Sequence, residues 1–285
     1  MKLPLLQSVE VLVIEGLESN NEDVASFLEE IFLSMRYVKQ LTIRRFPKLK
    51  VLPQELGTLS SLQELDIDDC VELESFVENV FQGLSFLRKL TISDCPRLKS
   101  LSSVAEHLTC LEILSIIVCP ELMTLPTNMN KLTSLHDVGI CAGEDNGRVP
   151  EGLQCIPSLK SLMLVEVDSL PEWLGDMTSL QRLFIGRSPR IRSVPSSFRN
   201  LTNLRSLTIE KCDGLEQRCQ RETGEDWPNI AHVPHVELIP TQQQKHTCWE
   251  LAKFSWNTRK ANISGFPEFN IFNSMVEGLH EQNQD

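Results

Sequence analysis

Residues 62–70 read LQELDIDDC, and this apolar-x-x-apolar-x-apolar phrase decides the fold. It recurs along most of the chain, with starts 21 to 29 residues apart. The clear copies are Val9-Leu12-Ile14, Val38-Leu41-Ile43, Leu62-Leu65-Ile67, Leu87-Leu90-Ile92, Leu111-Leu114-Ile116, Leu135-Val138-Ile140, Leu159-Leu162-Leu164, Leu180-Leu183-Ile185 and Leu204-Leu207-Ile209. A weaker tenth copy is Val233-Val236-Leu238. So many copies in one phase indicate an internal repeat.

The spacing within each copy predicts a short β-strand. Residues three and five positions after the start alternate with period two, so their side chains point to one face. One strand cannot bury that face alone, and successive strands therefore stack in parallel over a shared core. The units match the leucine-rich-repeat template, whose period is roughly 20–29 residues. We expect an α/β leucine-rich-repeat solenoid, a horseshoe or arc with a parallel concave sheet and helices, 3₁₀ turns and loops on its convex side.

The segments between the strands carry a second pattern. A proline follows an apolar residue at the start of five of them, namely at Pro53, Pro126, Pro150, Pro171 and Pro195. Because proline presets φ for a first helical turn, each segment is expected to begin a short helical or 3₁₀ turn.

The first unit is longer and predicts an amphipathic α-helix. Its polar start is Asn20-Asn21-Glu22-Asp23, and apolar residues then recur at helical spacing, at Val24, Phe27, Leu28, Ile31 and Phe32. We expect this to be the clearest helix of the solenoid.

Four cysteines share one place in their units, eight residues after the start: Cys70, Cys95, Cys119 and Cys212. The template places Asn or Cys there, and the side chain satisfies backbone groups at the turn out of the strand. A disulfide or metal ladder is the alternative. The best zinc candidate is Cys212, Cys219, His232 and His235, whose spacing misses the usual zinc-site windows. We expect no metal and no cofactor.

Charge and motifs narrow the function. The 285 residues carry a formal net charge of −12, which argues against nucleic acid or an anionic membrane as the main partner. No phosphate-binding loop, zinc-protease motif or nucleophile elbow occurs, so we do not expect an enzyme. Polar residues interrupt the first apolar stretch too early for a secretory signal, and we expect a cytoplasmic protein.

The repeat pattern divides the chain in two. Residues 1–240 are predicted to form a solenoid of about nine to ten repeats, including a terminal cap. Residues 241–285 lose the repeat and are expected to be a tail that is partly helical or disordered.

Particular phrases resemble one family. Residues 46–53 read FPKLKVLP, residues 94–101 read DCPRLKSL, and the closing segment 218–234 reads RCQRETGEDWPNIAHVP. The units resemble those of plant coiled-coil nucleotide-binding leucine-rich-repeat (NB-ARC-LRR) disease resistance proteins, and the closing segment looks like the end of that family's repeat domain. The phosphate loop of the family's nucleotide-binding domain does not occur in this sequence, so the resemblance covers only the C-terminal repeat portion.

This resemblance implies a function in recognition. The chain would be the ligand-sensing repeat domain of an intracellular plant immune receptor, in defence against pathogens. Its partner would be a protein: a pathogen effector, a guarded host protein, or a nucleotide-binding switch domain absent from this chain. The alternative is another leucine-rich-repeat scaffold, such as a ubiquitin-ligase substrate adaptor or an extracellular enzyme inhibitor.

A partner would first meet the residues that point away from the core on the concave side, which lie two, four, six and seven positions after each start. The charged candidates are Arg44, Arg45, Asp66, Asp68, Arg88 and Arg187, and the apolar candidates are Ile113, Ile117, Val118, Met163, Val165 and Phe184. An apolar patch flanked by charge is typical of a protein interface. Two alternatives remain open, namely mutual neutralisation of the charges between neighbouring rungs and a fully covered strand face at the apolar positions.

Overall fold

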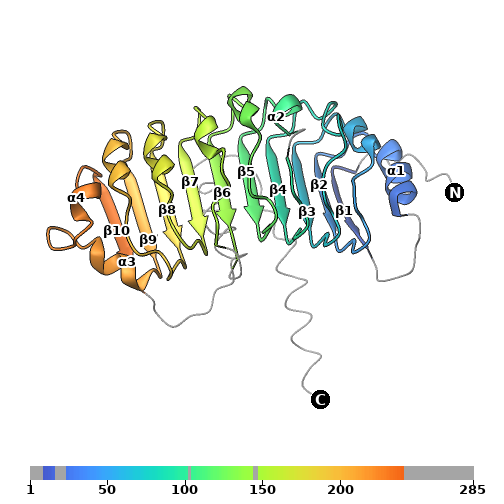
Figure 1. Cartoon of the computed structure of the whole chain (residues 1–285). Helices are drawn as coiled ribbons and strands as arrows, with labels where there is room; N and C mark the ends of the chain where they lie inside the picture. Colours follow the sequence, from blue (N-terminus) through green and yellow to red (C-terminus); the bar gives the residue numbers. More distant parts are fainter. Residues whose placement is uncertain (1–8, 17–23, 102–103, 144–146, 241–285) are drawn as a thin grey trace, which may run out of the picture. The chain divides into compact units, whose positions relative to one another are not determined.

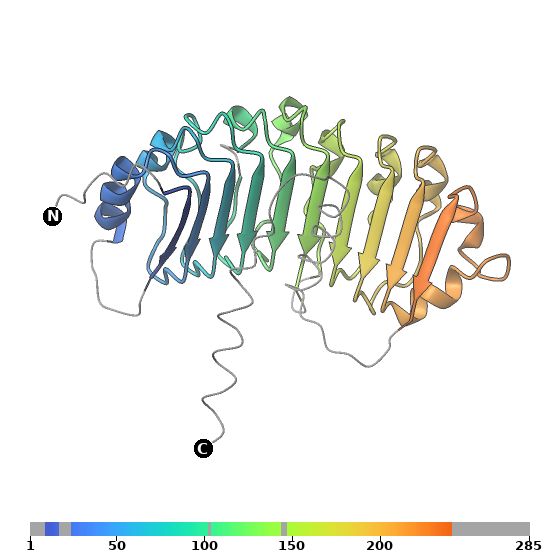
Figure 2. The same ribbon diagram turned by 180° about the vertical axis from the view of Figure 1, so that it is seen from behind.

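The described residues form one sheet of ten parallel strands, each five residues long, which follow one another in sequence order (Figures 1 and 2). The computed structural model describes residues 9–16, 24–101, 104–143 and 147–240, so the predicted tail 241–285 lies outside the described residues. The strands are β1 (Val11–Glu15), β2 (Gln40–Arg44), β3 (Glu64–Asp68), β4 (Lys89–Ser93), β5 (Ile113–Ile117), β6 (Asp137–Cys141), β7 (Ser161–Val165), β8 (Arg182–Gly186), β9 (Ser206–Glu210) and β10 (His235–Ile239).

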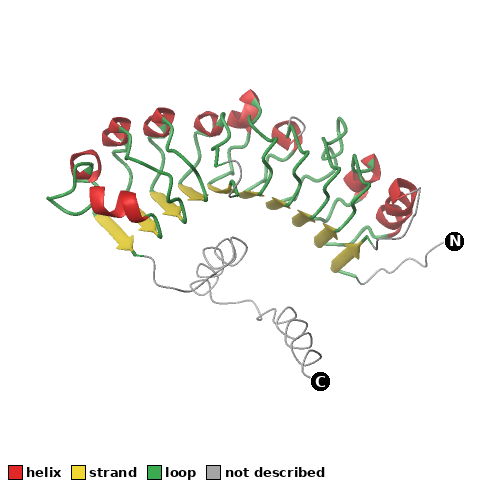
Figure 3. Ribbon diagram, turned by 60° about the horizontal axis from the view of Figure 1, so that its bottom comes forward, coloured by secondary structure: helices red, strands yellow, loops and turns green. Residues whose placement is uncertain are grey.

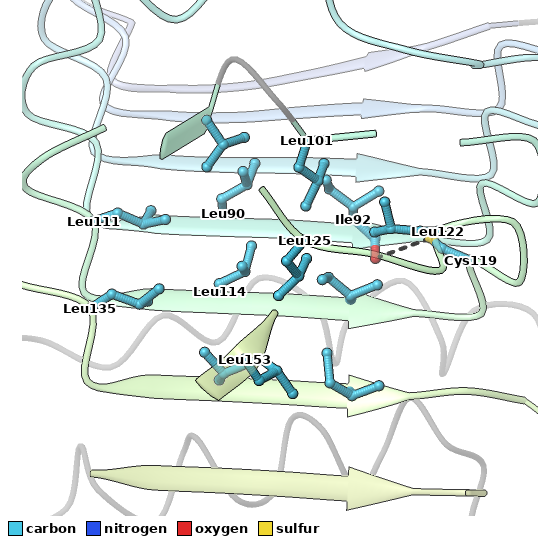
Figure 4. Close-up of a cluster of buried hydrophobic side chains, with 14 of the residues drawn as sticks. Leu90, Ile92, Leu101, Leu111, Leu114, Cys119, Leu122, Leu125, Leu135 and Leu153 are labelled. Atoms are coloured by element: carbon cyan, nitrogen blue, oxygen red, sulfur yellow. Dashed lines mark hydrogen bonds between the residues drawn. The ribbon is translucent and has the colours of Figure 1, made fainter. Parts of the chain in front are cut away.

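The predicted register is confirmed in every unit, including the weak tenth copy. Each strand begins two residues after its unit start, and equivalent residues pair across neighbours, as Leu41 does with Leu65 and Leu65 with Leu90. The inward positions of β2–β9 are at most 2% exposed. Successive rungs therefore share one continuous apolar core, part of which is drawn in Figure 4. Truncating one such leucine to alanine typically costs about 2–5 kcal/mol.

The convex side carries the short helices (Figure 3). They are α1 (Val24–Ser34), α2 (Val104–His107) and the 3₁₀ helices η1 (Gln54–Thr58), η2 (Thr127–Lys131), η3 (Leu153–Cys155), η4 (Glu172–Asp176) and η5 (Ser196–Asn200). Four of these 3₁₀ helices directly follow a proline, as predicted. After Pro150 the helix starts later, because Gly152 at φ 102° turns the chain first.

Helix α1 is the longest helix of the described residues, and its predicted capping residues lie outside them. Leu28, Ile31 and Phe32 are buried on one stripe. The expectation that Phe27 joins this stripe is wrong, since its side chain is 52% exposed. Residues one position apart point about 100° apart around a helix, and Leu28 takes the inward direction.

The closing segment folds over the last rungs through α3 (Asp213–Arg218) and α4 (Trp227–Ile230). Asp226, only 5% exposed, accepts hydrogen bonds from Nε and Nη2 of Arg218 and from the Val194 backbone N–H, all at 2.9 Å. Burial raises the pKa of Asp226, but the bonds from Arg218 and Val194 outweigh it and hold the pKa below its usual value. This ionised carboxylate ties the closing segment to the return segment of the eighth unit.

Candidate binding surface on the concave sheet

The apolar candidates gather on the middle strands, which positions them in neighbouring rows. Ile117, Cys141 and Val165 stand side by side on β5, β6 and β7, because the parallel register pairs each with the next. Met163 pairs in the same way with Phe184 on β8. Ile113 lies at the start of β5, and Val118 directly follows its end. The structure therefore places five of the six predicted apolar residues on β5, β7 and β8, and the sixth, Val118, directly after β5.

The expected solvent exposure of this group is wrong for half of it. Ile117, Met163 and Val165 are only 6%, 7% and 1% exposed, although they lie on the concave side. The Phe184 ring lies close to Gly186, where an added Cβ would meet its Cε1 at 2.5 Å, and Gly186 is the strand neighbour of Val165. Ile113, Val118 and Phe184 remain half-buried, so these three present the accessible part of the centre.

Sequence reasoning missed two residues of this centre. Cys141, only 3% exposed, fills the row between Ile117 and Val165. Asp137 is 2% exposed at the start of β6, with His136 Nδ1 at 3.1 Å and Arg182 Nη2 at 4.0 Å from its carboxylate. The repeat could have predicted both residues, since each occupies an outward position of the sixth unit.

The N-terminal flank of the centre is charged. Arg44 and Arg45 both bind Glu15 of the preceding rung, at 2.8 and 2.7 Å, and the hydrogen bond from Arg44 is the main cause that lowers the pKa of Glu15. Lys89 lies 3.9 Å from Glu64. Opposite charges on neighbouring rungs therefore do form ion pairs. Arg44 pairs with Glu15 on β1 and not with Asp68, its strand neighbour on β3.

Several carboxyl groups on this flank lie close to one another. Asp68 accepts a 2.6 Å hydrogen bond from Ser93 Oγ, and Asp66 stands between Thr42 and Thr91. Burial raises the pKa of Asp66, with Lys89 opposing. Burial, and then the nearby carboxylates of Asp68 and Asp69, raise the pKa of Asp94. The flank therefore carries closely spaced carboxyl groups, some of them partly buried, beside the apolar centre.

The carboxyl ends of the strands form a rim with an unusual backbone. After seven of the ten described strands, one residue adopts a left-handed conformation there: Arg45, Asp69, Asp94, Val118, Glu166, Arg187 and Lys211, with φ between 50° and 58°. The backbone N–H of each donates to the next rung, as Val118 does to the Cys141 carbonyl at 2.7 Å. A β-branched residue is rarely found at positive φ, so Val118 lowers the stability of the fold. The other six left-handed residues of this rim are charged.

Two further charged candidates, Arg187 and Arg88, each lie in an ion pair. Arg187 Nη2 is 3.0 Å from Glu166 Oε1. Arg88 is exposed and lies 3.0 Å from Glu112 of the next rung. These pairs border the centre on both sides. The Arg88–Glu112 pair is the exposed one, and an exposed pair of this kind contributes little to stability.

The four repeated cysteines are buried structural thiols, as predicted. Cys95 Sγ donates to the Ser93 carbonyl at 3.3 Å, and Cys119 Sγ to those of Ile117 at 3.5 Å and Ile92 at 3.9 Å (Figure 4). Ser188 takes the same place in the eighth unit and accepts from the Val167 N–H at 3.0 Å. Burial raises the pKa of Cys119 to about 12 and that of Cys212 to about 11.

The described residues contain neither a candidate metal site nor a helix suited to span a membrane. Within the described ranges, no group of three or more His, Cys, Asp or Glu side chains is placed to hold a metal ion. None of the helices in this part of the chain has the length and apolar character to span a membrane.

Comparison with known proteins supports the architecture. No protein-family model and no curated protein sequence matches the chain. A leucine-rich-repeat protein of Leptospira interrogans matches in structure with a TM-score of 0.51 and 20% identity over 85% of this chain; this chain spans 63% of that protein. The leucine-rich repeat domain of the type III effector XopL matches with a TM-score of 0.50 and 22% identity, over 77% of this chain and 86% of that one. The described part of the chain is a leucine-rich-repeat solenoid.

Proposed function

We propose that this solenoid is a protein-recognition module, the sensing portion of an intracellular plant immune receptor. One observation carries the recognition part: the concave sheet has an apolar centre, with Ile113, Val118 and Phe184 accessible, between charged borders. The plant immune assignment comes from the resemblance of the repeat phrases and of the closing segment 218–234. The partner would be a pathogen effector, a guarded host protein or a nucleotide-binding switch domain.

The strain at Val118 supports recognition over a purely structural surface. A valine at φ 52° is strained, whereas the other six left-handed residues of this rim are charged and not β-branched. Its side chain packs against Gly143, whose added Cβ would lie 3.4 Å from Cγ1. Strain that persists at an accessible apolar position is typical of a binding site. We expect no catalytic activity from this surface.

The test compares three forms of the chain as bait in plant extracts, with and without pathogen. The variant Ile113→Ser/Val118→Ser/Phe184→Ser removes the accessible centre. The control Val11→Ser/Val13→Ser removes two exposed apolar side chains, 46% and 48% exposed, from the end rung of the same face. Captured proteins are quantified by mass spectrometry, and far-ultraviolet circular dichroism checks the fold.

The proposal predicts a protein enriched at least about tenfold by the wild type and by the end-rung control, and lost with the central variant. Capture of a pathogen protein, a host defence component or a nucleotide-binding switch domain supports the immune assignment. Equal capture by all three forms contradicts recognition by this centre.

A further inference from the structure

The C-terminal end of the solenoid is an open rung. Strand β10 is the last of the sheet, and its outer edge pairs with no other strand of the described residues. Val236 and Leu238 stand in the inward rows, yet both remain half-buried, whereas Leu207 and Ile209 of β9 are fully buried. Among the described residues, no further rung therefore covers this end of the core.

A pocket with a volume of about 350 Å³ lies beside this open edge. Its apolar lining includes Val236 and Leu238 of β10, Trp227 of α4, Ala231 and the buried Cys219. This volume falls within the range of sites that take a ligand, roughly 300–1,000 Å³. The pocket thus adjoins the place where the inward side chains of one more rung would lie.

The molecule itself shows what covers such an edge. Nine times in succession, a strand edge is covered by a parallel strand in equal register that places apolar side chains at alternate positions over the core. We infer that the edge of β10 and its pocket bind an extended segment of a partner protein, which adds a parallel strand and inserts two apolar side chains, two residues apart, into the pocket. Binding of this type takes affinity from backbone hydrogen bonds and specificity from the pocket. It is a site separate from the concave surface.

Two polar residues of the lining limit the partner further. Arg221, whose side chain is 82% exposed, and His232 contribute to the pocket wall. The nearest carboxylate to Arg221 is the equally exposed Glu222 at 3.8 Å, a distance too long for a strong ion pair. A carboxylate next to the apolar pair of the partner segment is therefore favoured over a lysine.

The test uses a fluorescein-labelled peptide that copies residues 204–211 of this chain, LRSLTIEK, as a model strand. Its apolar pair is Leu207 and Ile209, followed by Glu210. Fluorescence anisotropy measures its binding to the full chain. A second peptide carries Leu207→Asp and Ile209→Asp, and a third carries Glu210→Lys.

Two protein variants locate the site. Ala231→Trp fills the pocket from an exposed lining position, and Thr223→Trp adds the same side chain at an exposed position outside the lining. Pro234→Trp, also at an exposed lining position, replaces Ala231→Trp if that variant loses its cooperative melting transition.

The expected result is binding of the model strand to the wild type and to Thr223→Trp, with at least about tenfold weaker binding to Ala231→Trp. The Asp peptide should bind at least about tenfold more weakly, and the Lys peptide several-fold more weakly. Absence of binding to the wild type, or equal binding to Ala231→Trp and Thr223→Trp, overturns the inference. Concentration-dependent self-association of the wild type that Ala231→Trp abolishes identifies a second copy as the occupant, which also overturns it.

Discussion

Strands β2–β4 and strands β5–β7 have equivalent interiors and contrasting concave surfaces. In both sets the inward positions are at most 2% exposed and follow the same register. On the concave side the first set carries Arg44, Asp66 and Asp68, whereas the second carries Ile117 and Val165. The inward residues therefore determine the fold, and the outward residues can differ between units without changing it.

The largest expected effect breaks the apolar side of this comparison. Val165→Asp places a carboxylate at a position that is 1% exposed, and we expect the free energy of unfolding to fall by about 3 kcal/mol. The control is Glu210→Val, since β9 carries an acid six residues after its unit start, as Val165 is in its own unit; it should change stability by less than about 1 kcal/mol. Urea unfolding measures both. Equal losses of unfolding free energy in the two variants would contradict an apolar environment at Val165 that differs from the environment of Glu210.

The second prediction tests the shared interior. Cys95 of the charged set and Cys119 of the apolar set have the same role, each donating from a buried thiol to a strand carbonyl. Cys95→Ala and Cys119→Ala should therefore lower the free energy of unfolding by similar amounts, about 1–2 kcal/mol each. Chemical denaturation in a reducing buffer provides the measurement. A difference above about 2 kcal/mol would contradict equivalent interiors.

The third prediction concerns the acidic flank and pH. Burial raises the pKa of Asp66, so the folded state takes up a proton at a higher pH than the unfolded state, and Asp66 disfavours folding at neutral pH. This cost is relieved as the pH falls through the raised pKa toward 3.8, the ordinary pKa of an aspartate. Asp66→Asn should therefore stabilise the chain at pH 7 by about 0.5 kcal/mol, and by progressively less on acidification.

Thermal unfolding at pH 7 and at mildly acidic pH measures this effect of Asp66→Asn. Glu30→Gln, at an exposed position of α1, is the control. Destabilisation by Asp66→Asn at pH 7 would show that the carboxylate is favourably paired.

The smallest effect lies at the border between the two sets. Arg88 of the fourth unit and Glu112 of the fifth form an ion pair at 3.0 Å with side chains 62% and 36% exposed. A double-mutant cycle with Arg88→Ala and Glu112→Ala should give a coupling energy below about 0.5 kcal/mol that weakens further with salt. A coupling above about 1 kcal/mol would show that charge also stabilises the border.

Sequence periodicity predicts the interior because the register is a property of the backbone. The rows of Leu65 and Ile67 continue from strand to strand without a shift, even in the weak tenth copy, where Val236 and Leu238 occupy them. The position of each outward residue followed from the same counting, and so did the buried place of Cys95.

What sequence could not predict depends on side-chain conformation. The choice of Glu15 by Arg44 and Arg45, and the Phe184 ring over Gly186, each depend on rotamers across rungs. The left-handed rim also has no glycine signal, since Val118 adopts positive φ without one. The expected exposure of Val165 is wrong, because the place of a residue in the repeat does not determine how neighbouring side chains cover it.

Site-specific photocrosslinking in plant cells tests the central claim most directly. The crosslinking residue p-benzoylphenylalanine replaces Phe184 in the apolar centre, or Thr208 on the concave side of β9, where both side chains are half-buried. We predict a discrete crosslinked protein from position 184 and none from position 208. Crosslinks of equal yield from both positions, or from position 208 alone, would contradict recognition by the centre of the sheet.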